Sequence, residues 1–277
     1  MSPVGKWRPF GLAMLLVSAV AVAAPVLDSE FGAGRGEASA FILQGGREAV
    51  TLGVAGKDLQ KAGLIGATAP VADTVSDPVS RLVVFQARGV FGSGLPLAAA
   101  APGGGVLRDV SGDGVFRIRD RVEQVGGRYL PFTLLRLTSA GSPPRPGTPL
   151  LDAGGRVAAV AHQPAGERTF YALPVEVVSR VLEDARDGEV SKVWLGLVLS
   201  PESRSTKVER VVEGSPAAQA GLRAGDVLQE MGGRRLDDYG DAVNAFYLLR
   251  PDRKIRVKVR RGAGDVVLEL TPRVAGS

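Results

Sequence analysis

The chain has 277 residues, of which 45% are hydrophobic and 23% are charged, which is enough for two domains with ordinary cores. It contains no cysteine and one histidine, which excludes a disulfide framework, a thiol nucleophile and cysteine-ligated zinc, and argues against transition-metal sites. Its 34 basic and 29 acidic residues are intermixed, so the net charge predicts solubility rather than nucleic-acid binding. We expect no metal, no cofactor and no nucleic-acid partner.

The first residues have the composition of an export signal. Two basic residues precede an apolar run from Phe10 to Ala24, and Ala21-Val22-Ala23 fits the small-x-small cleavage rule. The run is shorter than the roughly 20 residues that a membrane-spanning helix needs. We therefore expect a signal peptide over residues 1–23, a periplasmic location and a flexible segment over residues 24–37. An uncleaved anchor in the inner membrane is the alternative.

Short apolar runs separated by Gly or Pro follow from residue 38 onward. They recur about every ten residues, which is typical of an all-β barrel or sandwich. The runs are 40–43, 49–52, 81–86, 106–110, 115–119, 130–137, 157–161 and 169–172. After Pro174 the apolar residues change to helical spacing, and this pattern predicts a helix that ends at Gly188.

Oxygen-bearing side chains from Asp109 to Asp120 match the spacing of a calcium loop in outline. The flanking segments have the pattern of strands rather than helices. We therefore predict a hairpin that turns at Ser111-Gly-Asp-Gly114, and calcium binding stays open as the alternative.

The stretch from Arg145 to His162 resembles the nucleophile segment of HtrA/DegP-type trypsin-like proteases. In that family Gly-Asn-Ser-Gly-Gly-Pro-Leu precedes a hairpin and an apolar strand. The matching features here are Pro149-Leu150, Gly154-Gly155 and the strand Val157 to Ala161. The resemblance implies a mainly β chain with a trypsin-like double β-barrel over residues 38–188.

Proteases of this family act through His, Asp and Ser, in that chain order. Alignment on the family motifs places Val54 at the His position, Arg81 at the Asp position and Pro146 at the Ser position. The single histidine, His162, follows the nucleophile segment and so lies in the wrong order. The resemblance therefore implies a degenerate member, a pseudoprotease with no catalytic residue. The alternative is an HtrA-like serine endopeptidase with an atypical active site, acting in periplasmic protein quality control.

The second half of the chain resembles the junction between protease and PDZ domains in the same family. Phe170-Tyr-Ala-Leu-Pro174, the predicted helix and Val193-Trp-Leu-Gly-Leu197 carry this likeness. In the segment that follows, Ser215 fits a helix N-cap and Pro216 fits the first helical position. The resemblance implies a PDZ domain, an α+β partly open barrel, over residues 189–277.

A PDZ domain binds an extended C-terminus as an additional strand. The resemblance implies that Leu195-Gly196-Leu197-Val198 forms the carboxylate-binding loop and the strand edge. Val243 and Phe246, on a predicted helix over 241–249, are candidates for the other side of the groove, although both also fit core positions. We expect an exported, non-catalytic scaffold, chaperone-like protein or accessory subunit that binds C-terminal or extended peptides of protein partners through this groove. A membrane-protein or envelope complex and a homo-oligomer are open possibilities.

Overall fold

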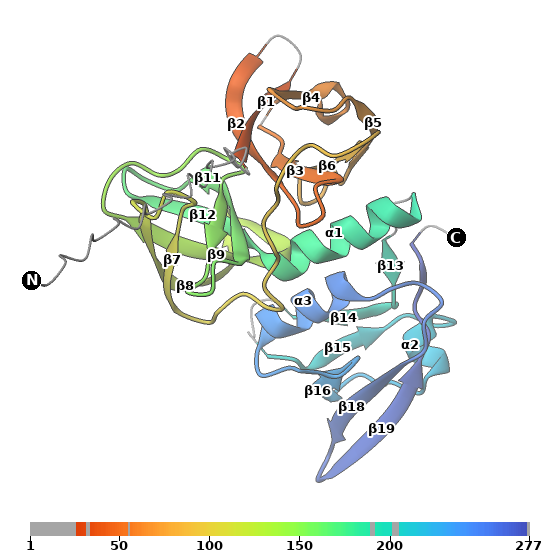
Figure 1. Ribbon diagram of the computed structural model, residues 1–277. Helices are drawn as coiled ribbons and strands as arrows, with labels where there is room; N and C mark the ends of the chain where they lie inside the picture. The colour runs from red at the N-terminus through yellow and green to blue at the C-terminus, as the bar shows by residue number, and fades with distance from the viewer. Residues whose placement is uncertain (1–25, 32–33, 55, 189–191, 201–204, 276–277) are drawn as a thin grey trace, which may run out of the picture.

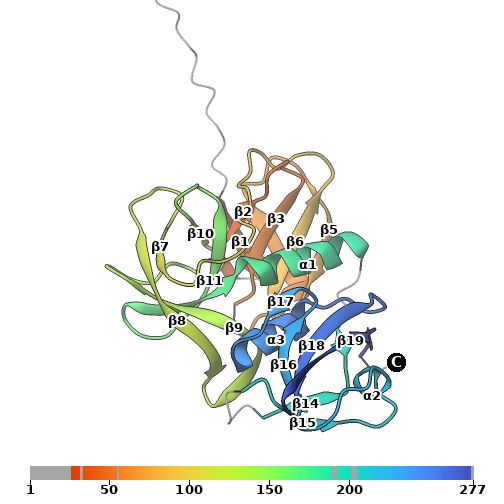
Figure 2. The same cartoon turned by 90° about the horizontal axis from the view of Figure 1, so that it is seen from below.

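The computed structural model describes residues 26–31, 34–54, 56–188, 192–200 and 205–275. Three units follow one another along the chain: a six-stranded sheet, a closed barrel and a smaller α+β unit (Figures 1 and 2). The expected fold class, mainly β with a double β-barrel before an α+β module, is confirmed in its mainly β composition and its two successive β units. Of these two units, the second is the closed barrel and the first is a six-stranded sheet. The predicted signal peptide lies outside the described residues. Within the described part of the chain, every helix is too short or too polar to span a membrane.

The first unit is an antiparallel sheet with the strand order β4-β1-β2-β3-β6-β5. Its elements are β1 (Val26–Phe31), β2 (Gly34–Ile42), β3 (Glu48–Leu52), η1 (Leu59–Lys61), β4 (Ala62–Ile65), β5 (Val71–Ser76) and β6 (Leu82–Ala87). Strand β6 is buried on both faces: Leu82 and Val84 contact one apolar cluster, and Val83 and Phe85 contact another. This explains why its sequence is a continuous apolar run.

Residues 24–37 were expected to form a flexible segment, and the described residues of this segment lie in strands β1 and β2. Strand β1 pairs with β2 on one side and with β4 on the other. Ser29 occupies a buried position, where its hydroxyl lies 2.8 Å from the Thr51 hydroxyl and donates to the Ala38 carbonyl. A polar residue therefore fills an inward position, and the strand lacks the apolar alternation that would have revealed it.

The second unit closes into a barrel with the order β10-β11-β12-β9-β8-β7. Its strands are β7 (Gly105–Arg108), β8 (Val115–Val125), β9 (Arg128–Ser139), β10 (Pro149–Leu151), β11 (Val157–Pro164) and β12 (Thr169–Pro174). Leucine and phenylalanine side chains such as Leu107, Leu137 and Phe170 fill its interior. The barrel is a packed core rather than a channel.

The predicted hairpin after β7 is confirmed, since β7 pairs with β8 directly. The Asp109 carboxylate accepts the N–H groups of Gly112 and Gly114, at 2.8 and 3.1 Å, and the hydroxyl of Ser111. Asp120, at the other end of the calcium-like pattern, lies in β8 and accepts from the Arg136 guanidinium at 2.8 Å. The Asp109 carboxylate therefore stabilises the turn, and the Asp120 carboxylate forms an ion pair between β8 and β9.

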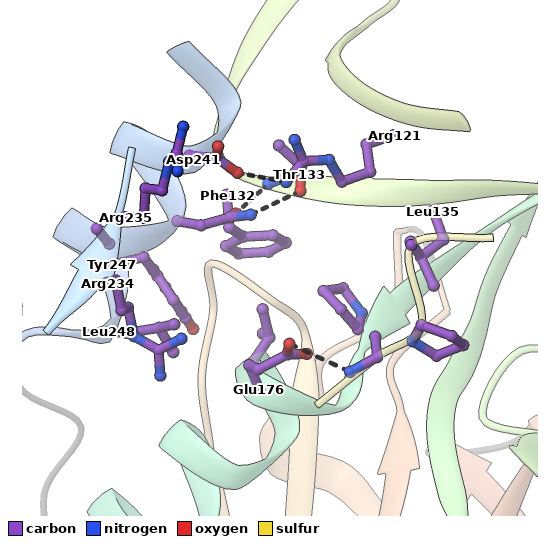
Figure 3. Close-up of a pocket in the computed structure, with 17 residues that line it drawn as sticks. Arg121, Phe132, Thr133, Leu135, Glu176, Arg234, Arg235, Asp241, Tyr247 and Leu248 are labelled. Carbon is purple, nitrogen blue, oxygen red and sulfur yellow. Dashed lines mark hydrogen bonds and ion pairs between the residues drawn. The ribbon is translucent and has the colours of Figure 1, made fainter. Parts of the chain in front are cut away.

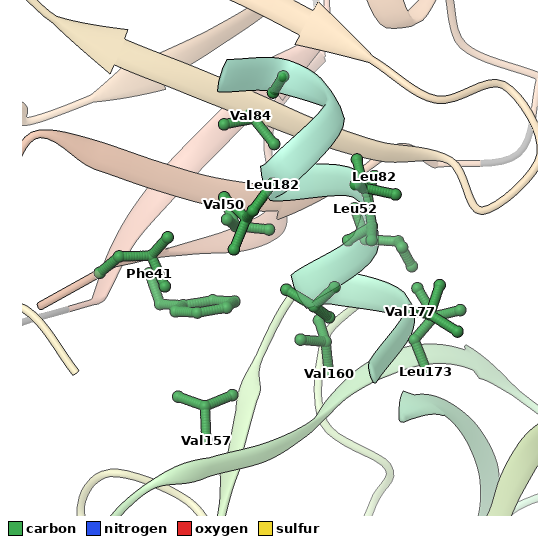
Figure 4. Close-up of a cluster of buried hydrophobic side chains, with 14 of the residues drawn as sticks. Phe41, Val50, Leu52, Leu82, Val84, Val157, Val160, Leu173, Val177 and Leu182 are labelled. Carbon is green, nitrogen blue, oxygen red and sulfur yellow. The ribbon is translucent and has the colours of Figure 1, made fainter. Parts of the chain in front are cut away.

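Helix α1 (Val175–Asp187) ends at Gly188, as predicted, where φ is 83°. Glycine adopts this left-handed conformation without steric cost, so it closes the helix. The apolar stripe of α1 joins the first sheet and the barrel in one core (Figure 4). Its members include Val50 and Leu82 from the sheet, Val160 and Leu173 from the barrel, and Val177 and Leu182 from the helix.

The third unit has its own apolar core. Its elements are β13 (Val193–Trp194), β14 (Leu197–Leu199), β15 (Val208–Val211), α2 (Pro216–Gln219), β16 (Val227–Met231), β17 (Arg234–Arg235), α3 (Tyr239–Leu248), β18 (Ile255–Arg261), β19 (Gly264–Leu270) and β20 (Arg273–Val274). The predicted start of α2 is confirmed: the Ser215 hydroxyl accepts the Ala218 N–H at 3.1 Å, and Pro216 takes the first helical position.

Helix α3 contacts the barrel as well as its own unit (Figure 1). The Asn244 amide pairs twice with Thr133 of β9: its oxygen accepts the Thr133 N–H at 2.7 Å, and its nitrogen donates to the Thr133 hydroxyl at 2.9 Å. One turn later, the Tyr247 ring meets Phe132 edge to face with centroids 4.7 Å apart. The Tyr247 hydroxyl donates to Asp77 at 2.9 Å. These contacts fix how the third unit sits on the barrel.

Candidate functional site

The three triad-like positions lie where the first sheet meets the barrel. Arg81 has a left-handed backbone with φ of 62°. Its Nε donates to the Gly53 carbonyl at 2.9 Å, and its Nη2 donates to the Val54 carbonyl. On the barrel side, the Pro146 carbonyl accepts the Ser39 N–H of β2 at 2.7 Å. The structure thus places Val54 and Arg81 in contact and Pro146 on the facing segment.

The residues at these three positions are valine, arginine and proline. Valine and proline side chains carry no titratable or nucleophilic group, and an arginine side chain is a cation with donors only. The carboxylate nearest in sequence, Asp77, accepts the N–H groups of Val79 and Ser80 at 3.1 and 2.9 Å as well as the Tyr247 hydroxyl. Asp77 therefore stabilises the turn before β6 and also binds the third unit through Tyr247.

His162 lies toward the end of β11, beside these positions. Burial, with a smaller contribution from the neighbouring Arg81 guanidinium, lowers the pKa of His162 to about 4. Its Nδ1 atom is buried and has no hydrogen-bond partner among the described residues. The imidazole is therefore neutral at pH 7 and lies next to a cation.

A groove of about 510 Å³ lies between the third unit and the barrel. All six residues predicted for peptide binding line this groove: Leu195, Gly196, Leu197, Val198, Val243 and Phe246. Val243 is only 8% exposed and also belongs to the core of the third unit, whereas Phe246 is partly buried against it. These two side chains of α3 therefore both line the groove and contribute to the packing of the third unit.

The turn at one side of the groove requires glycine. Gly196 has a φ of 73°, and a Cβ atom there would lie 2.1 Å from the Ser215 Cβ. The carbonyl of Leu195 accepts the Ala217 N–H at 2.9 Å, and the carbonyl of Gly196 accepts the Val212 N–H at 2.7 Å. The backbone of the turn is therefore fixed before any ligand arrives.

Strand β14 leads away from this turn and has an open edge. It pairs with β15 through Leu197 opposite Val211 and Val198 opposite Arg210. Within the described ranges, β15 is its only strand partner. The groove is lined by β14 and by the Val243 and Phe246 side of α3. This arrangement can accept an extended segment as an additional strand.

The sequence did not indicate that the first two units also line the groove. Val79, Leu130 and Pro131 of the first two units line it together with Tyr239 and Tyr247 of α3. The two tyrosines could have been found from the helix period, because they lie four residues before and after Val243. Val79, Leu130 and Pro131 meet the groove only through tertiary packing, which no local sequence pattern encodes.

A second cavity, of about 220 Å³, also lies between the barrel and the third unit (Figure 3). Polar pairs surround it: Asn244 with Thr133, Arg121 with Asp241 at 2.6 Å, and Glu176 with the backbone of Ala101 at 3.1 Å. These groups bind one another across the cavity, which identifies it as part of the contact between units.

Comparisons with known proteins match the third unit to a domain family and about half of the chain to curated relatives. The family model for the PDZ domain matches residues 193–271. A probable periplasmic serine endoprotease DegP-like from Marinomonas sp. (strain MWYL1) is 26% identical over 161 residues, which cover 52% of this chain and 34% of the relative. A protein of the same description from Chlamydia pneumoniae is 30% identical over 155 residues, which cover 50% and 32%. The matches span about a third of each curated relative.

Solved structures show the same fold. The HtrA-type protease AlgW with tripeptide superposes with a TM-score of 0.60 at 21% identity, covering 93% of this chain and 96% of that one. The HtrA-type protease AlgW with decapeptide gives 0.59 at 19% identity, covering 93% and 98%. The serine endoprotease from Yersinia pestis gives 0.51 at 18% identity, covering 91% and 95%. The likeness therefore extends over both β units and the α+β unit.

Proposed function

The chain belongs to the HtrA/DegP-like proteins with a PDZ domain, and we propose that it binds the C-terminal segments of other proteins without cleaving them. The observation that carries this proposal is the groove of about 510 Å³ along the open edge of β14, with the Gly196 turn at its side. Lys192 also lines the groove and adds a positive charge for a terminal carboxylate. The AlgW structures with a decapeptide and a tripeptide support a peptide as the ligand class.

The barrel supports a binding role rather than hydrolysis. Val54, Arg81 and Pro146 provide no nucleophile, no general base and no carboxylate. The relatives described as periplasmic support a periplasmic location, and the predicted signal peptide agrees with it. We propose that the protein acts there as a scaffold, chaperone-like protein or accessory subunit of an envelope complex.

A matched pair of glycine variants tests the groove. Gly196→Ala and Gly262→Ala both place a side chain at a positive φ, 73° and 60°. Only the first creates a clash, because a Cβ at Gly262 meets nothing within 4 Å. We expect peptides selected from a C-terminal library to bind the wild type and Gly262→Ala, and to lose at least tenfold in affinity with Gly196→Ala. Equal affinities for all three proteins would place the binding site elsewhere.

The description of the relatives as serine endoproteases favours a second candidate, an endopeptidase with an atypical nucleophile. A fluorophosphonate probe reacts with activated serines and so separates the two functions. We expect no labelling of the purified full chain, alongside a labelled active protease as the positive control. Labelling that disappears after a single Ser→Ala change would establish the enzyme instead.

A further inference from the structure

We propose that the cavity of about 220 Å³ between the barrel and the third unit binds a free α-amino acid with a small apolar side chain. The ammonium group of this ligand pairs with Glu176, and its carboxylate pairs with Arg234. The cavity is separate from the groove along β14, so the inference does not rest on the proposed function. It adds a small-molecule ligand that bridges two units of the chain.

Glu176 supplies the anionic group of this site. It lies in the first turn of α1 and lines the cavity (Figure 3). Its Oε1 accepts the Ala101 N–H at 3.1 Å, whereas its Oε2 is buried and has no hydrogen-bond partner among the described residues. A buried carboxylate oxygen without a donor is unfavourable. A ligand that brings an ammonium group to this position therefore gains a charge-assisted hydrogen bond.

Arg234 supplies the cationic group. It lines the cavity from β17 of the third unit, while Glu176 lines it from α1 (Figure 3). The other two arginines of the wall have acidic partners, since Arg121 pairs with Asp241 at 2.6 Å and Arg235 pairs with Asp237 at 2.7 Å. Arg234 has no such acceptor within the described part of the chain. Its planar guanidinium matches the geometry of a ligand carboxylate.

The remaining wall and the size of the cavity define the body of the ligand. Phe132 and Leu135 of β9, Val177 of α1 and Leu248 of α3 give the cavity an apolar side. A volume of about 220 Å³ corresponds to about seven water molecules at roughly 30 Å³ each. It lies below the range of about 300–1,000 Å³ that is typical for drug-sized ligands. A free aliphatic amino acid fits this volume and buries its side chain against the apolar wall.

The position of the cavity gives the ligand an effect on the whole chain. Its walls come from the barrel, α1 and the third unit, which the two hydrogen bonds between Asn244 and Thr133 hold together. A ligand that binds Glu176 and Arg234 at once requires this packed arrangement. Binding therefore stabilises the contact between the units by mass action.

The test uses the full chain and three probes, L-valine, L-leucine and L-methionine, in isothermal titration. We expect at least one probe to bind saturably with a dissociation constant of about 1 mM or tighter. The tightest probe is then compared with its amine, which lacks the carboxylate, and with its acid, which lacks the ammonium group. For L-leucine these analogues are 3-methylbutylamine and 4-methylpentanoate. Each analogue should bind about tenfold more weakly or worse, because it leaves one charged group of the cavity unpaired.

A matched pair of glutamate variants assigns the site. Glu176→Gln keeps an oxygen for the Ala101 N–H and removes the charge, so we expect about a tenfold loss of affinity for the tightest probe. Glu167→Gln is the control, because Glu167 is exposed and lines neither cavity; it should bind as the wild type does. Arg234→Gln tests the other end of the ligand and replaces Glu176→Gln if that variant fails to fold.

Three results would overturn the inference. They are no binding of any of the three probes, equal binding of the two one-charge analogues and the amino acid, and wild-type affinity in every folded cavity variant. Peptides of the C-terminal library should bind Glu176→Gln as they bind the wild type, since Glu176 does not line the groove. The amino-acid site and the peptide groove are therefore tested independently.

Discussion

Gly196 in the groove and His162 beside Arg81 show how much a single residue depends on its surroundings. Gly196 combines a φ of 73° with a 2.1 Å approach to Ser215, and its motif made it predictable from the sequence. The surroundings of His162 were not predictable in the same way. Burial and, to a smaller extent, the nearby Arg81 guanidinium lower the pKa of His162, and these two residues are 81 positions apart in the chain.

The unusual pKa of His162 gives a direct prediction. The chain has one histidine, so its imidazole ¹H resonances identify it without ambiguity in an NMR pH titration. We expect a midpoint near pH 4 in the wild type, because burial and then Arg81 oppose protonation. Arg81→Gln should move the midpoint upward. A wild-type midpoint at the ordinary value of about 6.5 would show that the side chain is solvated.

The same shift couples folding to pH. The folded-state pKa of about 4 lies below the unfolded value, so between the two values the unfolded chain binds more protons. The contribution of His162 to stability is complete above about pH 6.5 and is lost as the pH falls toward 4, up to about 3 kcal/mol. His162→Phe should therefore show a weaker loss of stability between pH 7 and pH 4 in urea unfolding. Parallel pH profiles for the two proteins would contradict this account.

Helix α1 shows what a periodic pattern can and cannot reveal. Its apolar stripe and its end at Gly188 followed from the sequence, since both depend on local chemistry. The burial of Arg180 and Asp184 did not, because charged residues are normally placed in solvent. Asp184 is buried between two cations, Arg180 in the same helix and Arg250 in the third unit. Arg250, which offsets part of the cost of burying Asp184, lies 66 residues further along the chain.

Removing the central carboxylate of this network should be costly. Asp184→Asn leaves two arginines without their shared anion in a buried position, and breaking such pairs costs about 3–5 kcal/mol. Asp187→Asn, an exposed acid at the end of the same helix, is the matched control and should change stability by less than about 0.5 kcal/mol. Urea unfolding followed by tryptophan fluorescence measures both. Similar free energies of unfolding for the two variants would show that the ion-pair network contributes little to stability.

The order of the units along the chain could be predicted from motifs, but their mutual placement could not. The nucleophile-like segment, the junction at Phe170–Leu197 and the α2 cap are local features. Val79, Leu130 and α3 line the groove together, and they come together only once the units pack. The strand β1 was also missed, because hydrogen bonds satisfy its inward Ser29 in place of apolar packing.

The contacts of α3 with the barrel predict that the units unfold together. Wild-type protein should show one transition, because Asn244 and Tyr247 join the third unit to β9 and Asp77. In Asn244→Ala/Tyr247→Phe, these hydrogen bonds are lost at about 1 kcal/mol each or more. We expect two separate transitions in calorimetry for this variant. A single unshifted transition in the double variant would show that other contacts couple the units.

The most direct test of carboxylate recognition compares one library-selected peptide as its free acid and as its C-terminal amide. Isothermal titration with the full chain should give binding to the acid that is at least tenfold tighter, because only the acid presents an anion to the Gly196 turn and Lys192. Mass spectrometry of the same sample should recover the peptide intact. Equal affinity for acid and amide, or recovery of a cleaved peptide that depends on the protein, would contradict the account.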